Sequence, residues 1–238
     1  MVLIGRGCKS RSAQQEQSGE TAEAQQNAPE SVVPTEPDTT VTIAAVGDIM
    51  MYDEQLDAAR QDDGTYDFTS SFAAVSGSTV SADLTVGNLE LNFCGEPYSG
   101  KPDFRAPESL AKTLSSIGFD VLQTANTYSI QNGLSGLQST IRYLDAAGLS
   151  HVGTYAAQDD KTSLGGVLLK NVNGVKIAFI AYTKGLNYLT LPEGEEYAVD
   201  VLYTDYASDF NKINTDAIVE SVNAAKALQP DVIVAMLH

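Results

Sequence analysis

Five side chains that can bind a metal ion stand immediately after short apolar runs of the sequence. They are Asp48, Asn88, Glu90, Asn126 and His238. Carboxylate, amide and imidazole groups together suit a divalent ion such as Mn²⁺, Fe²⁺, Zn²⁺ or Mg²⁺. A bound cation lowers the pKa of its water and can hold an anionic substrate. The alternative for the two carboxylates is a turn or helix cap after a strand, and for the two asparagines a turn.

The apolar runs before these groups are short and aliphatic, as buried strands are. They cover residues 41–46, 82–86, 120–124, 176–182 and 231–237. In an open, mostly parallel sheet the carboxyl ends of the strands line one edge, and ligands bind at that edge. The sequence therefore predicts that the five candidate ligands converge there.

Helical patterns alternate with these strands. The predicted helices cover residues 54–60, 68–75, 107–118, 134–147 and 209–228, the last being the longest. The turn sequence Asn171-Val-Asn-Gly174 lies between two further apolar runs and predicts a hairpin, so that the sheet is mixed. Residues 150–153 predict another strand, in which His151 has a structural role. This order predicts an α/β fold, a layered sandwich of mixed β-sheets flanked by helices.

Three further side chains are candidates for binding a substrate at the same edge. Arg105 and Lys184 are two of only 14 cationic residues, and either could bind a carboxylate or a phosphate. Tyr128 follows Asn126 on the same predicted turn. The loop formed by residues 91–106 is rich in Gly and Pro and is expected to lie over the edge. For the two cations the alternative is ordinary surface charge.

Composition excludes several classes of partner. The 238-residue chain is long enough for one substantial core, and its formal net charge is −17 with a pI near 4.3. Nucleic acid and anionic lipid surfaces would be repelled by this charge. The two cysteines, Cys8 and Cys94, have no zinc or redox spacing, and no disulfide is expected between them.

The N-terminal residues 1–40 differ in composition from the rest. Met1 to Cys8 resembles the shortened end of a bacterial lipoprotein signal, in which a cysteine becomes lipid-modified, although Arg6 fits that pattern badly. Lys9 to Thr40 has almost no large apolar residue and predicts a disordered tether. We therefore expect a tethered domain at residues 41–238, anchored to a membrane through a lipid in the full-length form.

An ordered set of short motifs resembles the bacterial capsule-synthesis proteins of the poly-γ-glutamate CapA type. The motifs are Gly47-Asp-Ile-Met50, Tyr66-Asp-Phe68, Ala82-Asp-Leu-Thr-Val-Gly-Asn-Leu-Glu90, Phe104-Arg-Ala-Pro107, Gly118-Phe-Asp-Val121, Ala125-Asn126, Ala147-Gly148, Gly153-Thr-Tyr155, Gly174-Val-Lys-Ile-Ala-Phe179 and Leu237-His238. The resemblance implies a calcineurin-like metallophosphatase fold with a metal centre at strand ends. It also implies an extracytoplasmic protein that takes part in making or exporting poly-γ-glutamate or another capsular polymer. By position in the motifs, Asp48, Asn88 or Glu90, Asn126 and His238 correspond to the metal-proximal groups.

Two departures from the family pattern bear on activity. Many relatives have Ala-Asn-Asn-His followed three residues later by Asp, whereas this chain has Thr127, Tyr128 and Gln131 at the corresponding positions. Relatives also continue beyond the position of His238, so we expect that a C-terminal part is missing here. Three functions stay open: a capsule-synthesis protein with an altered catalytic centre, a metal-dependent hydrolase of phosphoester or cell-envelope polymer bonds, and a non-catalytic polymer-binding module.

Overall fold

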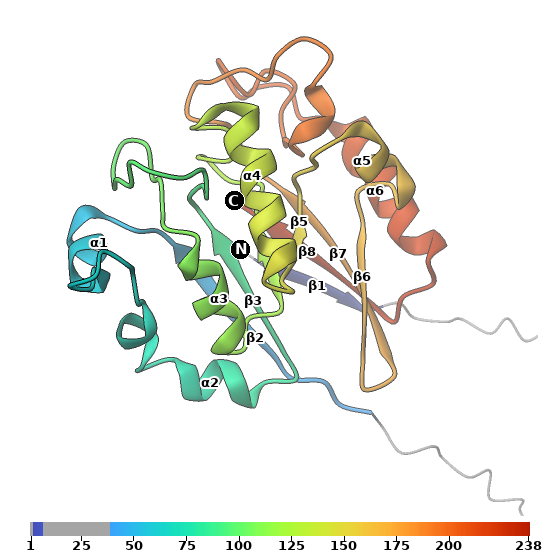
Figure 1. The fold of residues 1–238 in the computed structure, drawn as a ribbon. Helices are drawn as coiled ribbons and strands as arrows, with labels where there is room; N and C mark the ends of the chain where they lie inside the picture. The colour runs from blue at the N-terminus through green and yellow to red at the C-terminus, as the bar shows by residue number, and fades with distance from the viewer. Residues whose placement is uncertain (1, 7–38) are drawn as a thin grey trace, which may run out of the picture.

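Two β-sheets pack face to face, and helices cover the outer face of each (Figure 1). This arrangement comes from a computed structural model, which describes residues 2–6 and 39–238. The predicted tether falls almost wholly on residues 7–38, outside the described residues. The predicted α/β layered fold is confirmed.

The first sheet is built from four parallel strands in the order β2-β3-β4-β5. Their bounds are Ile43–Ile49 for β2, Leu84–Leu89 for β3, Val121–Gln123 for β4 and Ser150–Val152 for β5. We expected mixed sheets, and this one is wholly parallel because helical crossovers join its consecutive strands. All six residues of β3 are buried, as expected for an inner strand covered on both faces.

The second sheet is mixed, with the order β1-β8-β7-β6. Its strands are β1 Val2–Arg6, β6 Leu168–Val172, β7 Val175–Tyr182 and β8 Val232–Leu237. β7 and β8 run parallel, and the predicted hairpin joins β6 to β7 antiparallel. Asn173 and Gly174 adopt φ values of 53° and 87°, which the two-residue hairpin turn requires. β1 pairs antiparallel with β8 and was not predicted.

The helices are short and connect the strands. They are α1 Asp53–Ala59, η1 Thr69–Phe72, α2 Ser76–Ser81, α3 Ser109–Ser116, α4 Gly133–Ala146, α5 Gln158–Ser163, η2 Glu196–Ala198 and α6 Thr215–Ala227. None of the helices within the described residues is long and apolar enough to span a bilayer.

Three apolar clusters hold the layers together. Leu110 and Leu114 of α3 pack with Leu89 and Leu122 on the outer face of the parallel sheet. Between the sheets, side chains from inner strands of both meet. Their buried members from the strands are Leu84, Val86, Val121, Val152, Ile177, Phe179, Ala181, Val234 and Met236. Ala225 of α6 packs with residues of β7 on the far side.

The longest predicted helix, over residues 209–228, begins too early. α6 starts only at Thr215, because the Asp205 carboxylate accepts the N–H groups of Asn211 (2.9 Å) and Lys212 (3.0 Å) and holds that segment as a loop. Phe210, which lies within the predicted helix, adopts φ 53°, outside the helical region. The predicted helix over residues 68–75 is likewise only the 3₁₀ turn η1, and α2 follows it.

Candidate metal centre

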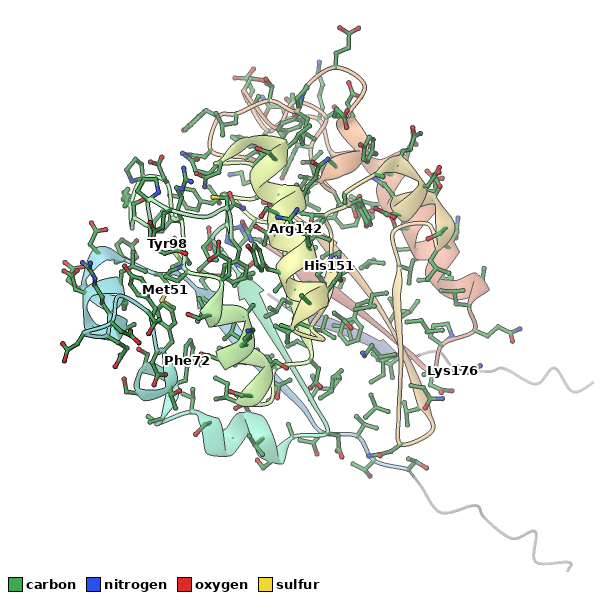
Figure 2. All side chains as sticks on the ribbon, viewed as in Figure 1. Met51, Phe72, Tyr98, Arg142, His151 and Lys176 are labelled. Atoms are coloured by element: carbon green, nitrogen blue, oxygen red, sulfur yellow. The ribbon has the colours of Figure 1, made fainter. Side chains whose placement is uncertain are left out.

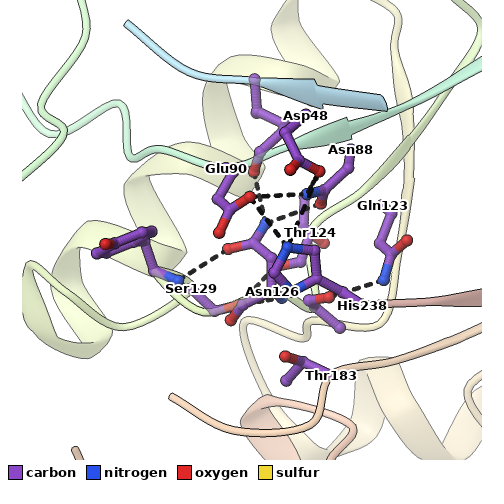
Figure 3. Close-up of polar contacts among 12 residues, drawn as sticks. Asp48, Asn88, Glu90, Gln123, Thr124, Asn126, Ser129, Thr183 and His238 are labelled. Atoms are coloured by element: carbon purple, nitrogen blue, oxygen red, sulfur yellow. Dashed lines mark hydrogen bonds and ion pairs between the residues drawn. The ribbon is translucent and has the colours of Figure 1, made fainter. Parts of the chain in front are cut away.

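The carboxyl ends of strands from both sheets meet at one place (Figure 3). Asp48 lies near the end of β2, Glu90 directly follows β3, and His238 directly follows β8. One potential ligand atom from each of these three side chains lies within 4.8 Å of the other two. The predicted convergence therefore holds for Asp48, Glu90 and His238, which come from strands far apart in the sequence.

A bulge in β2 aims Asp48 at this site. Ala45 pairs with Val86, but Asp48 pairs with Asn88, so two residues of β2 lie opposite Gly87 alone. A bulge of this kind re-aims side chains at the end of a strand. Gly87 itself must lack a side chain, since a Cβ atom there would lie 2.8 Å from the Phe119 ring.

The three side chains differ in exposure. The Glu90 side chain is 6% exposed, that of His238 21% and that of Asp48 55%. Nε2 of His238 lies 3.0 Å from Oε2 of Glu90 and 3.9 Å from Oδ1 of Asp48. The bond to Glu90 and the charges of both carboxylates raise the pKa of His238, although its partial burial opposes this. The site is thus anchored by buried Glu90 and opens to solvent at Asp48.

Asn88 joins the two carboxylates. Its Nδ2 donates to Asp48 Oδ1 at 2.8 Å and to Glu90 Oε2 at 3.2 Å. Two carboxylates that share one amide and one imidazole form an electron-rich cluster, whose donor set suits a hard or borderline divalent cation. The residues present therefore fit a divalent metal.

Asn126 fixes the side chain of Asn88 by a hydrogen bond. Its Nδ2 donates to Asn88 Oδ1 at 3.2 Å and to the Leu89 carbonyl at 2.7 Å, while its Oδ1 accepts the Tyr128 N–H at 3.1 Å. Both ends of the Asn126 amide are therefore bonded to protein groups. In this arrangement Asn126 positions Asn88, and its role as a ligand stays a prediction.

The three predicted substrate-binding residues lie in different surroundings. The ring centres of Tyr128 and Phe104 lie 4.6 Å apart. Burial together with the Glu90 charge raises the pKa of the Tyr128 phenol. Lys184 is exposed, and its backbone N–H donates to the His238 carbonyl at 2.8 Å. Arg105 donates from Nη2 to the carbonyls of Cys94, Gly95 and Glu96 and so fixes the loop over residues 94–105. Substrate binding by each of the three stays a prediction.

A buried hydroxyl network that the sequence analysis missed supports the turn after β4. Ser129 Oγ donates to the Thr124 carbonyl at 2.6 Å and accepts the Asn126 N–H at 2.8 Å. Gln123 Nε2 donates to the carbonyls of Ala125 and Tyr182 at 2.8 and 3.4 Å, which connects the two sheets. A serine three residues after Asn126 is a turn signal that could have indicated the first contact, whereas the contact between sheets has no local signal.

Known proteins match the chain along most of its length. The sequence profile described as "Bacterial capsule synthesis protein PGA_cap" matches residues 42–238. The capsule biosynthesis protein CapA of Bacillus anthracis is 25% identical over 192 residues, which are 78% of this chain and 42% of that protein. The PGA biosynthesis protein CapA of Bacillus subtilis (strain 168) is 26% identical over 158 residues, 63% of this chain and 39% of that protein. An uncharacterized protein, y4sH, of Sinorhizobium fredii is 35% identical over 81 residues, 30% of this chain and 17% of that protein.

The chain spans about two fifths of the length of the two capsule proteins, since the matched regions cover 42% and 39% of them. The profile match begins just before β2 and includes Asp48, Glu90 and His238. The family has a metallophosphoesterase-like fold, in agreement with the two stacked sheets and their outer helices. The profile match over residues 42–238 shows that the chain belongs to the bacterial capsule synthesis protein family.

Proposed function

We propose that this chain binds a divalent metal at Asp48, Glu90 and His238 and uses it in the synthesis or export of an anionic capsular polymer of the poly-γ-glutamate type. One observation carries the proposal: the ligand atoms of these three side chains, from three strands of two sheets, lie within 4.8 Å of one another. Family membership supports the capsule role, because the two curated relatives are named for capsule and PGA biosynthesis.

Charge explains why a metal would be needed. The chain carries a net charge of −17, so a polyanion is repelled unless a cation is placed between them. When bound, a divalent ion supplies a positive centre that attracts a carboxylate or phosphate and polarises it. The protein's part is to keep Glu90 buried, to hold Asn88 between the carboxylates and to leave Asp48 accessible from solvent.

A second candidate is hydrolysis of a phosphoester or cell-envelope polymer bond at the same centre. Tyr128 supports it, since burial and the Glu90 charge raise the pKa of its phenol, which is protonated at neutral pH. A protonated phenol can donate a hydrogen bond to a leaving group, and a histidine at this position could also accept a proton. The remaining alternative, a polymer-binding module without metal, requires the three-residue cluster to have no metal affinity.

The test is turnover by the chain loaded with Mn²⁺ or Zn²⁺, on γ-linked glutamate oligomers and on a panel of phosphoesters. Hydrolysis that is lost in Asp48→Asn but kept in Asp63→Asn, an exposed aspartate in a turn, supports the hydrolase. Stoichiometric metal without turnover supports a metal-assisted binding role. Absence of metal from correctly folded protein contradicts both and leaves the polymer-binding module.

We also propose that the protein acts outside the cytoplasm, attached through Cys8. The lipoprotein-like sequence before Cys8 supports this, and processing there would remove β1, which comprises Val2–Arg6. Labelling of cells with a radioactive fatty acid tests it, with Cys8→Ser as the variant and Cys94→Ser as the matched control. Label that persists in Cys8→Ser would rule out this anchor.

A further inference from the structure

An open pocket of about 260 Å³ lies next to the candidate metal centre. It is lined by Thr127, Lys184, Gly185, Asn187, Tyr188 and Phe210. Two of its lining residues connect it to the centre: Thr127 directly follows Asn126 in the sequence, and the backbone N–H of Lys184 donates a hydrogen bond to the His238 carbonyl at 2.8 Å. We propose that this pocket is a subsite for one carboxylate-bearing unit of a polymer whose neighbouring unit lies at the metal. The inference rests on the proposed function and names the substrate class of that site.

The pocket holds a cation without an acidic partner. Lys184 is exposed, and the ion pairs found among the described residues do not include it. Its Nζ lies 4.7 Å from the centre of the Phe210 ring, a cation–π contact that keeps the ammonium at the pocket wall. Most basic side chains among the described residues also lack an ion pair, and what distinguishes Lys184 is that its ammonium lines a pocket beside an aromatic ring, where it can bind an anion.

The backbone around the pocket is held in conformations that side chains rarely adopt. Of the six non-glycine residues with positive φ among those described, three line the pocket: Asn187 at 52°, Tyr188 at 62° and Phe210 at 53°. Such a backbone conformation persists where the surroundings fix it, which is common at binding sites. Here Asn187 Nδ2 donates to Gln131 Oε1 at 3.0 Å and ties the loop to the turn after Asn126.

Two aromatic rings make up the rest of the wall. The strained loop presents Tyr188 to solvent with 80% of its surface exposed, although burying such a ring is usually favourable. Phe210 is fixed by close packing, since a Cβ atom on Gly185 would lie 2.7 Å from its Cε1. A ring held exposed beside an ammonium gives an apolar surface for the methylene groups of a ligand and a charge for its carboxylate.

The volume of the pocket limits how much of a ligand it can hold. Pockets that enclose whole drug-sized molecules have about 300–1,000 Å³, so 260 Å³ suits one unit of a longer chain. A flexible chain of amide-linked units, each with a carboxylate and a short aliphatic stem, matches both the ammonium and the rings. Phosphate matches the ammonium alone.

The sequence offers a direct reporter for the test. The chain contains no tryptophan, so Tyr188→Trp introduces a single one into the pocket. A γ-linked glutamate pentamer is titrated into this variant, and Val80→Trp on α2, where Val80 is 63% exposed, serves as the matched control reporter. We expect a saturable change in tryptophan fluorescence for Tyr188→Trp and none for Val80→Trp.

Charge and ligand class are then tested separately. Adding Lys184→Gln to the reporter variant is expected to weaken pentamer binding at least about fivefold, whereas Lys112→Gln, which removes an exposed lysine of α3, leaves it unchanged. The pentamer with its side-chain carboxylates converted to amides should not bind.

Equal affinities in the Lys184→Gln and Lys112→Gln backgrounds, or no saturation with the pentamer, would overturn the proposal. Saturation with inorganic phosphate alone would overturn the assignment of the ligand as a carboxylate.

Metal content of the same samples separates this inference from the proposed function. Metal bound in all variants, together with a failed titration, refutes the subsite and leaves the metal centre standing. Pentamer binding without any metal supports the subsite and refutes the metal-dependent function.

Discussion

At the scale of the single residue, Asn88 offsets part of the repulsion between the two carboxylates of the site. Its one amide group donates to both Asp48 and Glu90 and is itself held by Asn126. Without a cation, this donor and His238 are what offset the repulsion between the two carboxylates. A bound cation relieves this repulsion, and that relief favours cation binding.

Asn88→Asp should therefore have opposite effects with and without metal. A third carboxylate replaces a donor, so the metal-free protein should lose about 1–3 kcal/mol of stability, whereas Mn²⁺ should stabilise the variant more than it stabilises the wild type. Thermal unfolding with chelator and with Mn²⁺ measures both effects. Equal loss of stability in the two conditions would show that no cation is bound between these carboxylates.

His151 is not part of this centre, and its surroundings predict how the stability of the fold changes at acidic pH. Its side chain is 20% exposed beside α4 (Figure 2), its Nδ1 is buried without a hydrogen-bond partner, and its Nε2 is 3.6 Å from Asp145. Burial lowers the pKa of His151 below its ordinary 6.5, although the Asp145 and Asp160 charges oppose the shift. The unfolded chain therefore takes up this proton first, and the contribution of His151 to the stability of the folded chain falls as the pH drops below about 6.5.

His151→Phe removes that proton site and an unpartnered nitrogen. We expect unchanged or higher stability at pH 7.5 and a shallower loss between pH 6.5 and pH 5, measured by urea unfolding across that range. His238 contributes with the opposite sign, because its raised pKa favours the folded state at low pH. An identical pH dependence in wild type and His151→Phe would contradict the assignment.

At the scale of the elements, the site depends on how closely the two sheets approach beneath it. Gly153, which follows β5, has φ 96°, and a Cβ atom there would lie 2.5 Å from Ala125 Cβ and 3.0 Å from Ala181 Cβ. Ala125 precedes Asn126, and Ala181 lies in β7 of the other sheet. Any side chain at Gly153 would push the turn after β4 away from β7.

Gly153→Ala should cost about 1–3 kcal/mol from overpacking, and the forced left-handed backbone adds to this. It should also weaken metal binding by displacing Asn126. The matched control is Gly77→Ala in α2, which meets nothing within 4 Å and should stabilise the protein by up to about 1 kcal/mol. Urea unfolding of both variants is the measurement, and a Gly153→Ala protein as stable as wild type would refute the close approach.

Local patterns predicted most of the strands, including short ones. The apolar runs gave β2, β3, β4, β7 and β8, and the Asn-Gly turn gave the hairpin. The predictions that were wrong concern segments whose conformation is fixed by contacts between residues far apart in the sequence or by side-chain bonds within a loop. The start of α6 was misplaced because Asp205 holds the preceding loop. The helix α5 was not expected because it is short and polar and is fixed by an ion pair, at 2.8 Å, between half-buried Lys161 and buried Asp200.

The same distinction applies to the site. Asp48 and Glu90 could be predicted to lie together because they stand at the carboxyl ends of β2 and β3, which are neighbours in one parallel sheet. His238 comes from the other sheet, and the packing of the two sheets that brings it to the same place has no local signal. The bulge that turns Asp48 toward Asn88 has no signal in the sequence. The pocket around Tyr188 and Phe210 also escaped prediction, since positive φ at large residues follows from tertiary contacts.

At the scale of the whole molecule, acidity and metal binding are connected. A chain with a net charge of −17 repels anionic polymers at long range, and a bound divalent ion reverses the sign locally. The metal would also bind groups from β2, β3 and β8 and thereby join both sheets. Metal binding should consequently stabilise the fold as a whole.

A ligand that binds only the folded chain at 100 times its dissociation constant contributes about 2.7 kcal/mol. We expect the midpoint of thermal unfolding to rise with Mn²⁺ and to return to its original value with chelator. Glu90→Gln should abolish the rise, whereas Glu54→Gln, on exposed α1, should keep it. A rise of the same size in Glu90→Gln would place the metal elsewhere.

The most direct measurement is the metal content of the purified, reloaded chain by elemental mass spectrometry, with Asp48→Asn, Glu90→Gln and His238→Ala compared to wild type. One divalent ion per wild-type chain, lost in Glu90→Gln and reduced in the other two variants, is the predicted result. No stoichiometric metal in folded wild type, or full occupancy in all three variants, would contradict the assignment of Asp48, Glu90 and His238 as a metal centre.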